Sequence, residues 1–367
     1  MTLGDLRVFA GPLRYVQGPG ALDELGRLVA PYGPRPLVVT DPFVRELLGP
    51  RVEDLLRSAG LRPEIRELPG EITAMAAYEI AGTLKDLDVG VVVGLGGGKA
   101  LDAGKAVSLL LGVPVVTVPT IASNDSPTSK AVAMYDEQHR MVSVDQLPAN
   151  PHAVVVDTAL IAAAPAHFLR AGVGDAVSKT FEAAACAAGT GVTTLGTRPL
   201  RVGAAIAAAA YETLREHAVA GLAACQRGEV TDDLEAVVEA VVLLSGMGFE
   251  NGGLSLAHSL TRGLMQARGA SSALHGQHVA WATLVQRVAE FAPDHEVEDL
   301  RGFLRSVGLP VTLPELGMAD PTAEEIRQIA AVTMTAPHLA NLARPVSEGD
   351  LVAAILEVER GSAGGEG

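Results

Sequence analysis

Short apolar runs alternate with amphipathic stretches over roughly the first 160 residues of the chain. The runs are four to six residues long, and they lie at 36–40, 65–68, 89–94, 115–119 and 153–157. Stretches with apolar side chains at helical spacing lie between them, at 43–59, 74–87 and 101–111. Short runs bounded by turn residues are typical of buried strands. Strands that alternate with helices predict a parallel sheet covered by helices on both faces.

The pattern changes after about residue 165. Valine-rich runs become rare, and alanine-rich stretches at helical spacing replace them, for example at 204–210, 234–244 and 351–358. We therefore predict an α/β, Rossmann-like domain over residues 1–165 and an all-α domain over residues 166–367. The cleft between two such domains is the expected place for a ligand.

Composition narrows the functional classes. The formal charge of −15 disfavours nucleic acid as a partner. The two cysteines, Cys186 and Cys225, lack CxxC spacing, which disfavours a cysteine metal site and is consistent with a reducing cytoplasm. The first seven residues show no basic segment followed by an apolar run, so no signal peptide is expected. The apolar run from Val89 is broken by glycines before it could cross a bilayer, so no membrane association is expected.

A glycine-rich loop, Gly96-Gly97-Gly98, lies between a predicted strand and a predicted helix. Glycines let backbone N–H groups approach a phosphate closely, and the start of a helix adds partial positive charge. The spacing matches neither GxGxxG nor GxxxxGK[ST], so the phosphate hypothesis depends on context alone. A tight turn without a ligand is the alternative.

Asp41 ends the first predicted strand. An acid at this position can accept hydrogen bonds from a ribose and repels a 2′-phosphate, which would favour NAD over NADP. The same side chain could instead cap the helix that follows Pro42. The sequence leaves both interpretations open.

Several motifs occur together and in order between about residue 10 and about residue 290. They are the loop and helix GGGKALDAGKAV at 96–107, PTIASNDSP at 119–127, GVGDA at 172–176, GFENGGLSLAH at 248–258 and LHG at 274–276. The set resembles the zinc-dependent glycerol dehydrogenase branch of the iron-containing alcohol dehydrogenase superfamily. The resemblance implies the fold shared by dehydroquinate synthase and iron-type alcohol dehydrogenases, and it implies a homo-oligomer.

The resemblance also implies the chemistry: a dehydrogenase that passes a hydride between NAD and a small polyol, with Zn²⁺ stabilising the alkoxide. Asp175, His258 and His275 match the zinc ligands, and His258 and Asp125 would act in catalysis. Asp125 would contact substrate hydroxyls, and Phe249 would form an apolar wall. Besides Asp41, the implied cofactor contacts are Gly96, Gly97, Gly98, Thr117, Thr120, Ser129 and Tyr135.

Without the resemblance, the three metal ligands are ambiguous. A lone histidine such as His258 is more often a satisfied core residue, and Asp175 after a glycine could cap a helix. Two imidazoles and one carboxylate do suit zinc with an open fourth position. Iron-type relatives carry a fourth ligand, a histidine, one helical turn after the aspartate. Here that position is Lys179, whose ammonium cannot ligate a cation, which favours zinc over iron.

Three positions depart from the well-known glycerol enzymes: Asn124, Lys130 and His278. They lie near pocket motifs and leave the identity of the polyol open. A sugar-phosphate cyclase or a glycerol-1-phosphate dehydrogenase on the same fold is the alternative enzyme class. Such enzymes need a basic cluster for the phosphate, and the sequence shows none beside the three metal-ligand motifs. A non-catalytic binding protein is the alternative outside enzymes.

Overall fold

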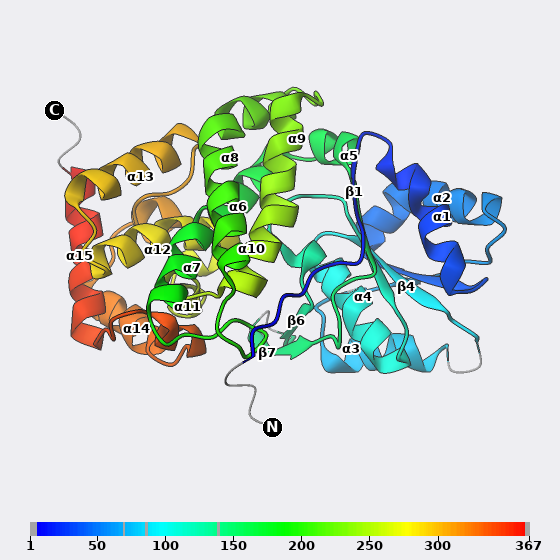
Figure 1. Ribbon diagram of the computed structural model, residues 1–367, viewed down its shortest axis with the longest axis horizontal. Coiled ribbons are helices and arrows are strands. Elements are labelled where there is room, and N and C mark those ends of the chain that lie inside the picture. Colours follow the sequence, from blue (N-terminus) through cyan, green and yellow to red (C-terminus); the bar gives the residue numbers. More distant parts are fainter. Residues whose placement is uncertain (1–5, 69, 85–86, 138–139, 364–367) are drawn as a thin grey trace.

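The computed structural model describes residues 6–68, 70–84, 87–137 and 140–363, so the first five residues of the N-terminal segment lie outside it. Figure 1 shows an α/β part, blue to cyan, beside a helical part, green to red. The N-terminal segment runs along the helical part before it enters the sheet as β1 (Tyr15–Gly18).

Six parallel strands form the sheet, in the order β1-β8-β5-β4-β2-β3. Besides β1 they are β2 (Pro36–Thr40), β3 (Glu64–Glu67), β4 (Val91–Gly96), β5 (Val115–Pro119) and β8 (Ala153–Asp157). All five strands expected from the sequence are confirmed, within two residues at each end. The short and half-buried β1 was not predicted, because its four residues carry little apolar signal.

Helices cover both faces of the sheet, as predicted. Val38 and Val93 point into a core with α1 (Leu25–Val29) and α2 (Pro42–Ser58). Their neighbours Val39 and Val92 point into the opposite core, with α3 (Ala74–Gly82) and α4 (Gly98–Leu111). Successive side chains of a strand point to opposite faces, so continuous valine runs are what a doubly covered sheet requires.

One local prediction was wrong, and one hairpin was missed. The helix expected over 74–87 ends at Gly82, after which the chain turns and buries Leu84; residues 85–86 lie outside the described part. The hairpin of β6 (Ala131–Tyr135) and β7 (Met141–Gln146) was not predicted. Every residue of β7 is exposed, so this strand has no buried face to mark it in the sequence.

The second half of the chain is helical, and no strand occurs in its described residues after β8. After α5 (Thr158–Ala163), the helices are α6 (Ala166–Val177), α7 (Lys179–Ala188), α8 (Arg201–Gln226), α9 (Asp232–Glu239), α10 (Ser245–Gly252), α11 (Leu256–Leu264), α12 (His275–Ala289), α13 (Asp294–Ser306), α14 (Ala323–Thr333) and α15 (Glu348–Ala363). A π-helical segment, Ala240–Leu244, joins α9 to α10. The three helical stretches expected from the sequence are thus confirmed.

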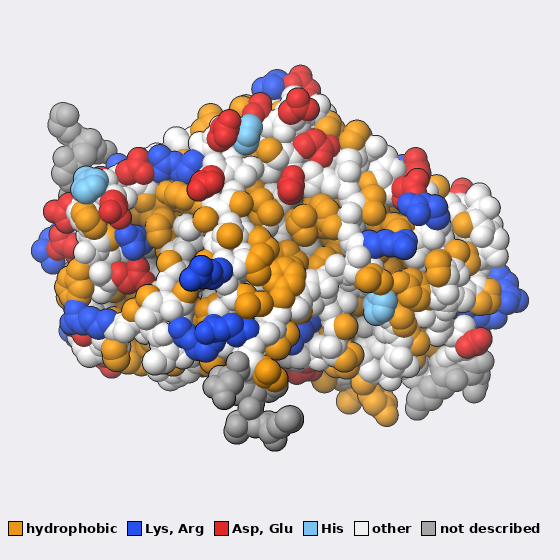
Figure 2. All heavy atoms as spheres, in the orientation of Figure 1, with side chains coloured by type: hydrophobic (Ala, Val, Ile, Leu, Met, Phe, Trp, Pro, Cys, Tyr) orange, Lys and Arg blue, Asp and Glu red, His pale blue; other side chains and the backbone are white. Residues whose placement is uncertain are grey.

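The surface on the face drawn in Figure 2 carries scattered Lys and Arg side chains, while Asp and Glu gather at its upper edge over α8 and α9. Within the described ranges, no single helix has both the length and the apolar composition of a membrane span. One bent pair, Asp232–Gly252 with Leu256–Leu264, meets these criteria only when its two members are taken together.

Candidate functional site

The glycine loop connects the carboxyl end of β4 to the start of α4. Gly96 has a φ of +141°, and a Cβ there would lie 2.8 Å from the Cβ of Ala100, so only glycine fits without strain. The N-cap Gly97 provides no side chain to cap α4. The first N–H groups of the helix are therefore free of a side-chain cap and can receive an anion.

Asp41 has one carboxylate oxygen for each of its two expected roles. Its Oδ1 accepts a hydrogen bond from Val44 N at 2.9 Å and caps α2. Its Oδ2 faces the glycine loop and lies 3.1 Å from the position that a Cβ of Gly96 would take. Capping and cofactor binding are therefore compatible, because they use different oxygens.

The remaining expected cofactor residues surround the turn after β5. Thr120 lies at the loop, since its N–H donates to Gly96 O at 3.1 Å. Thr117 is fully buried and its hydroxyl donates to Pro127 O at 2.7 Å, so it supports the turn from beneath. Ser129 Oγ accepts from Ala131 N, and Tyr135 is half-buried at the end of β6.

The three expected metal ligands come together from three helices. Asp175 lies on α6, His258 on α11 and His275 at the first position of α12. One donor atom from each lies within 4.8 Å of the others. The Oδ1 of Asp175 is 3.2 Å from His258 Nε2 and 3.8 Å from His275 Nε2. Asp175 is buried, whereas 42% of the His275 side chain is exposed, so the cluster has an open side.

Glycines next to two of the ligands let α6 and α12 approach closely. A Cβ on Gly276 would lie 1.7 Å from Ala171 O, and one on Gly174 would lie 2.3 Å from Gly276 O. Neither contact is possible for a residue with a side chain. The missing side chains thus bring Asp175 and His275 within reach of one ion.

Glu182 is a residue of this cluster that the sequence analysis missed. It is fully buried on α7, and its Oε2 lies 2.6 Å from His258 Nδ1. Its Oε1 accepts from the N–H groups of Ser255 and His258. Burial opposes ionisation of Glu182, but His258 and these donors lower its pKa to about 2. A carboxylate on Nδ1 turns Nε2 of His258 toward Asp175, as in many metal sites.

Lys179 occupies the middle of the cluster. Its side chain is 1% exposed, and its Nζ lies 2.7 Å from Asp175 Oδ1 and 3.0 Å from His258 Nε2. Burial lowers the pKa of His258, but the negative charge of Glu182 and the hydrogen bonds to Asp175 and Glu182 together raise it by more, so the net shift is upward. The Lys179 ammonium can only donate, however, so Nε2 of His258 must accept its hydrogen bond. His258 is therefore the neutral tautomer, with its proton on Nδ1. Lys179 was expected only as a residue that cannot ligate iron, and its contacts came from the structure.

Asp125 and Phe249, the expected substrate residues, lie beside this cluster. Asp125 Oδ2 accepts from Ser245 Oγ at 2.7 Å and pairs with Lys179 Nζ at 3.2 Å. Burial, reinforced by the charge of Asp175, raises the pKa of Asp125. The ring of Phe249 lies 5.5 Å from Lys179 Nζ. One compartment therefore holds polar groups for hydroxyls and an apolar wall.

The three departures from the glycerol enzymes have separate surroundings. Asn124 lies over the glycine loop, with Nδ2 3.1 Å from the position of a Gly98 Cβ. The backbone N–H of Lys130 donates to Glu250 Oε1 at 3.1 Å. His278 is buried in the helical core, where its Nε2 meets Ala270 O at 2.7 Å.

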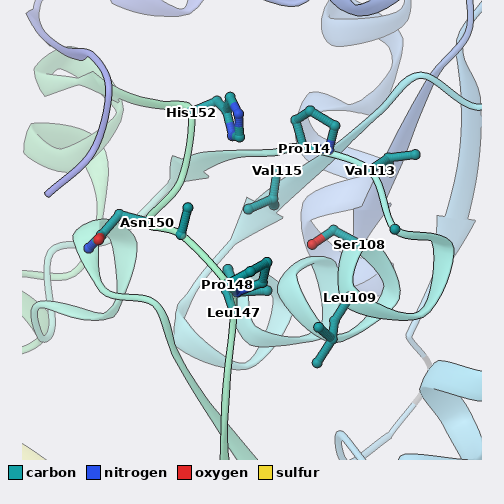
Figure 3. A pocket seen from close by; sticks show the side chains of 11 residues that line it. Ser108, Leu109, Val113, Pro114, Val115, Leu147, Pro148, Asn150 and His152 are labelled. Carbon is teal, nitrogen blue, oxygen red and sulfur yellow. The ribbon is translucent and has the colours of Figure 1, made fainter. Parts of the chain in front are cut away.

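A separate surface pocket lies at the other end of the sheet (Figure 3). Its cavity of about 260 Å³ is lined by Ser108, Leu109, Val115, Pro148 and His152, among others. Val115 is the first residue of β5, whereas the glycine loop follows the last residue of β4. Ligands of open parallel sheets bind at the carboxyl ends of the strands, so we place the site at the glycine loop and the histidine cluster.

Comparison with known proteins identifies the family of the chain. The model of the iron-containing alcohol dehydrogenase family matches residues 12–158. The chain is 38% identical over 324 residues to a glycerol dehydrogenase of Escherichia coli O6:H1, and the match covers 88% of each. It is 39% identical over 323 residues to a glycolaldehyde reductase of Halobacterium salinarum, again covering 88% of each. The chain belongs to the glycerol dehydrogenase group of the iron-containing alcohol dehydrogenase family.

Solved structures of the family support the same assignment. A probable glycerol dehydrogenase from Sinorhizobium meliloti 1021 aligns with a TM-score of 0.91 and 34% identity. The alignment covers 97% of this chain and 99% of that one. The expected fold is thereby confirmed, and the chain is an oxidoreductase of the alcohol dehydrogenase type.

The donor set of this family member fits a divalent metal. Burial opposes ionisation of Asp175, but the adjacent Lys179 ammonium favours it, and the pKa of Asp175 is lowered, so this carboxyl is ionised. Partial burial of the His275 ring disfavours its charged form and lowers its pKa to about 4. The imidazole is therefore neutral. Donors held about 2.0–2.2 Å from a tetrahedral zinc lie roughly 3.4 Å apart, and the two distances from Asp175 Oδ1 are 3.2 and 3.8 Å. Protonation and spacing both suit the ion.

Proposed function

We propose that this chain is a zinc-dependent, NAD-linked dehydrogenase that interconverts a small vicinal diol, similar to glycerol, and its hydroxyketone. The observation that carries the proposal is the cluster of Asp175, His258 and His275 with Asp125 beside it. The names of the relatives, glycerol dehydrogenase and glycolaldehyde reductase, agree with a small hydroxylated substrate. When bound, NAD⁺ would supply the hydride acceptor, so oxidation of the diol would give the hydroxyketone, NADH and H⁺.

Asp175, His258 and His275 would hold the zinc, which when bound would act as a Lewis acid for the reacting hydroxyl. Glu182, which contacts Nδ1 of His258, would leave Nε2 free to ligate the ion. Asp125 Oδ1 receives no hydrogen bond among the contacts of the described residues, so it can accept one from the second hydroxyl of a diol. Phe249 would exclude water from the carbon that loses the hydride.

The NAD site would extend from this cluster to the glycine loop. The pyrophosphate would lie on the N–H groups of Gly96, Gly97 and Gly98, and Asp41 Oδ2 would accept from the adenosine ribose. Thr120, Ser129 and Tyr135 would border the cofactor, with Thr117 beneath them. We assign NAD binding to residues 1–165 and metal binding to residues 166–367.

A phosphorylated substrate is disfavoured by the charges in the compartment. Lys179 carries the positive charge inside the cluster, and its ammonium is already paired with Asp125 and Asp175. A phosphate would have to compete with both carboxylates for it. This observation weakens the cyclase and glycerol-1-phosphate dehydrogenase alternatives.

Metal analysis combined with a substrate screen tests the proposal. Protein purified without added metal should contain about one zinc per chain, as three ligands with an open position imply. It should oxidise small diols with NAD more efficiently, by kcat/KM, than mono-alcohols or phosphorylated polyols. Stoichiometric iron with iron-dependent activity would contradict the zinc assignment, and a preference for phosphorylated polyols would contradict the substrate class.

A further inference from the structure

Lys179 is the one side chain of the cluster that the proposed chemistry does not use. It is buried, yet it touches three charged or polar groups: Asp175 Oδ1 at 2.7 Å, His258 Nε2 at 3.0 Å and Asp125 Oδ2 at 3.2 Å. Two of these atoms are proposed metal donors. The third belongs to the proposed substrate-binding carboxylate.

We propose that the Lys179 ammonium and the metal compete for Asp175 and His258, and that the ammonium moves onto Asp125 when the metal binds. The inference rests on the proposed metal site. Both cations need the same lone pairs, those of Asp175 Oδ1 and His258 Nε2. Two cations cannot share a donor at these distances without strong repulsion.

The compartment already contains the destination of the ammonium. Asp125 Oδ2 is 3.2 Å from Nζ, and the flexible lysine stem needs only a small rotation to favour it. Ser245 fixes the same carboxylate oxygen from the opposite helix at 2.7 Å. Lys179 would thus neutralise Asp175 in the metal-free protein and Asp125 in the metal-bound protein. Metal binding would thereby be coupled to the charge state of the substrate compartment.

A zinc titration tests the competition. Protein freed of metal by a chelator is titrated with Zn²⁺ against a competing chelator, for the wild type, Lys179→Met, Lys179→Gln and the control Lys99→Met. Lys99 also carries one positive charge, but it is 43% exposed and paired with Glu71 away from the donors. Both Lys179 variants should bind Zn²⁺ about 10- to 100-fold more tightly, the range that groups next to metal ligands command. Lys99→Met should not differ from the wild type.

Thermal unfolding provides a second readout, which does not use the competing chelator. Without metal, Lys179→Met leaves Asp125 and Asp175 uncompensated, so its Tm should fall below that of the wild type. Saturating Zn²⁺ should raise the Tm of the variant more than that of the wild type. A zinc-induced rise of equal size in both proteins would overturn the inference.

A double-mutant cycle tests the proposed movement. Asp125→Asn should weaken Zn²⁺ binding in the wild-type background, because the displaced ammonium loses its new partner. In the Lys179→Met background the same change should have a smaller effect. Equal effects in the two backgrounds would show that Asp125 does not receive the ammonium.

The outcomes separate this inference from the proposed function. If the wild type and Lys179→Met bind one Zn²⁺ with equal affinity, the competition is overturned and the zinc-enzyme proposal stands. If only the Lys179 variants bind Zn²⁺, the competition is upheld and the zinc-enzyme proposal falls. If none of the proteins binds Zn²⁺, both are overturned.

Discussion

Asp125 has one carboxylate oxygen in a structural contact and one left for the proposed substrate contact. Its Oδ2 accepts from Ser245 and pairs with Lys179, while no hydrogen bond from the described residues reaches its Oδ1. Asp41 divides its oxygens in the same way, with Oδ1 on the N–H of Val44 and Oδ2 toward the glycine loop. In both residues, a change from carboxylate to amide separates the structural task from the ligand task.

Asp125→Asn should lower kcat/KM for diols by the equivalent of ~1–3 kcal/mol, the cost of a weakened buried hydrogen bond. A mono-alcohol, which lacks the second hydroxyl, should lose much less. The measurement compares the two substrates at saturating Zn²⁺, where occupancy of the metal site is maintained. Equal losses for both substrates would remove Asp125 from the substrate site.

Asp41→Asn should keep the helix cap, because asparagine caps helices as well as aspartate does. The folded stability should therefore hardly change. Loss of the negative charge should raise kcat/KM with NADP relative to NAD, since repulsion of the 2′-phosphate disappears. A lower Tm with an unchanged cofactor ratio would mean that Asp41 acts only as a cap.

At the scale of elements, helix packing assembles the metal donors. α6 and α12 cross where Gly174 and Gly276 have no side chains, next to Asp175 and His275. α7 adds Lys179 and Glu182 on the same side, one and two turns after Asp175. The spacing i, i+4, i+7 from Asp175 was the signal that could have revealed Glu182 in the sequence.

Gly276→Ala should therefore reduce both stability and metal affinity. The new methyl group would lie 1.7 Å from Ala171 O, so the helices must separate and His275 must move. Overpacking of this kind costs about 1–3 kcal/mol, or more where backbone is in the way.

Gly302→Ala on α13 is the matched control, because nothing lies within 4 Å of its new Cβ. The control should be stabilised slightly, by about 0.5–1 kcal/mol. Denaturant unfolding and zinc titration of both variants check this, and equal behaviour would contradict the close crossing.

At the scale of the whole molecule, buried polar contacts connect the α/β part to the helical part. Glu250 on α10 accepts from the N–H of Lys130 and from the amide of Asn150, both in the α/β half of the chain. Burial raises the pKa of Glu250. Asn251, the next residue, exchanges two hydrogen bonds of 2.8 Å with the backbone of Ala10 and holds the N-terminal segment against the helices. These contacts fix the two parts on either side of the proposed site.

Glu250→Gln should weaken this connection. Glutamine replaces a carboxylate oxygen by an amide nitrogen, whose N–H would face the N–H of the Asn150 amide. A donor would then face a donor. We expect a loss of about 1–3 kcal/mol in the free energy of unfolding, measured by denaturant titration. In an Asn150→Ala background, where no amide faces position 250, the same change should cost less. An equal cost in both backgrounds would show that the two side chains act independently.

Features that depend on local order along the chain could be predicted from the amino-acid pattern alone. Runs such as 36–40 and 115–119 form buried strands because continuous apolar residues suit a sheet covered on both faces. The glycine loop follows from its place between strand and helix. The ordered motifs named Asp175, His258 and His275 together, and the structure brings them within reach of one ion.

Which side chains face one another across the site depends on how the helices pack in three dimensions, and no sequence pattern specifies it. Lys179 was expected as an absent iron ligand, and the packing of α7 against α11 places its ammonium on the donors themselves. His278 follows a ligand motif by three residues, yet its position on α12 points it into the core. Strand β7 is exposed along its whole length, so no buried face marks it as a strand in the sequence. Periodicity specifies which face of an element is buried, whereas the partner of a polar side chain depends on elements 80 or more residues away, such as Asp175 and His258, which are 83 positions apart.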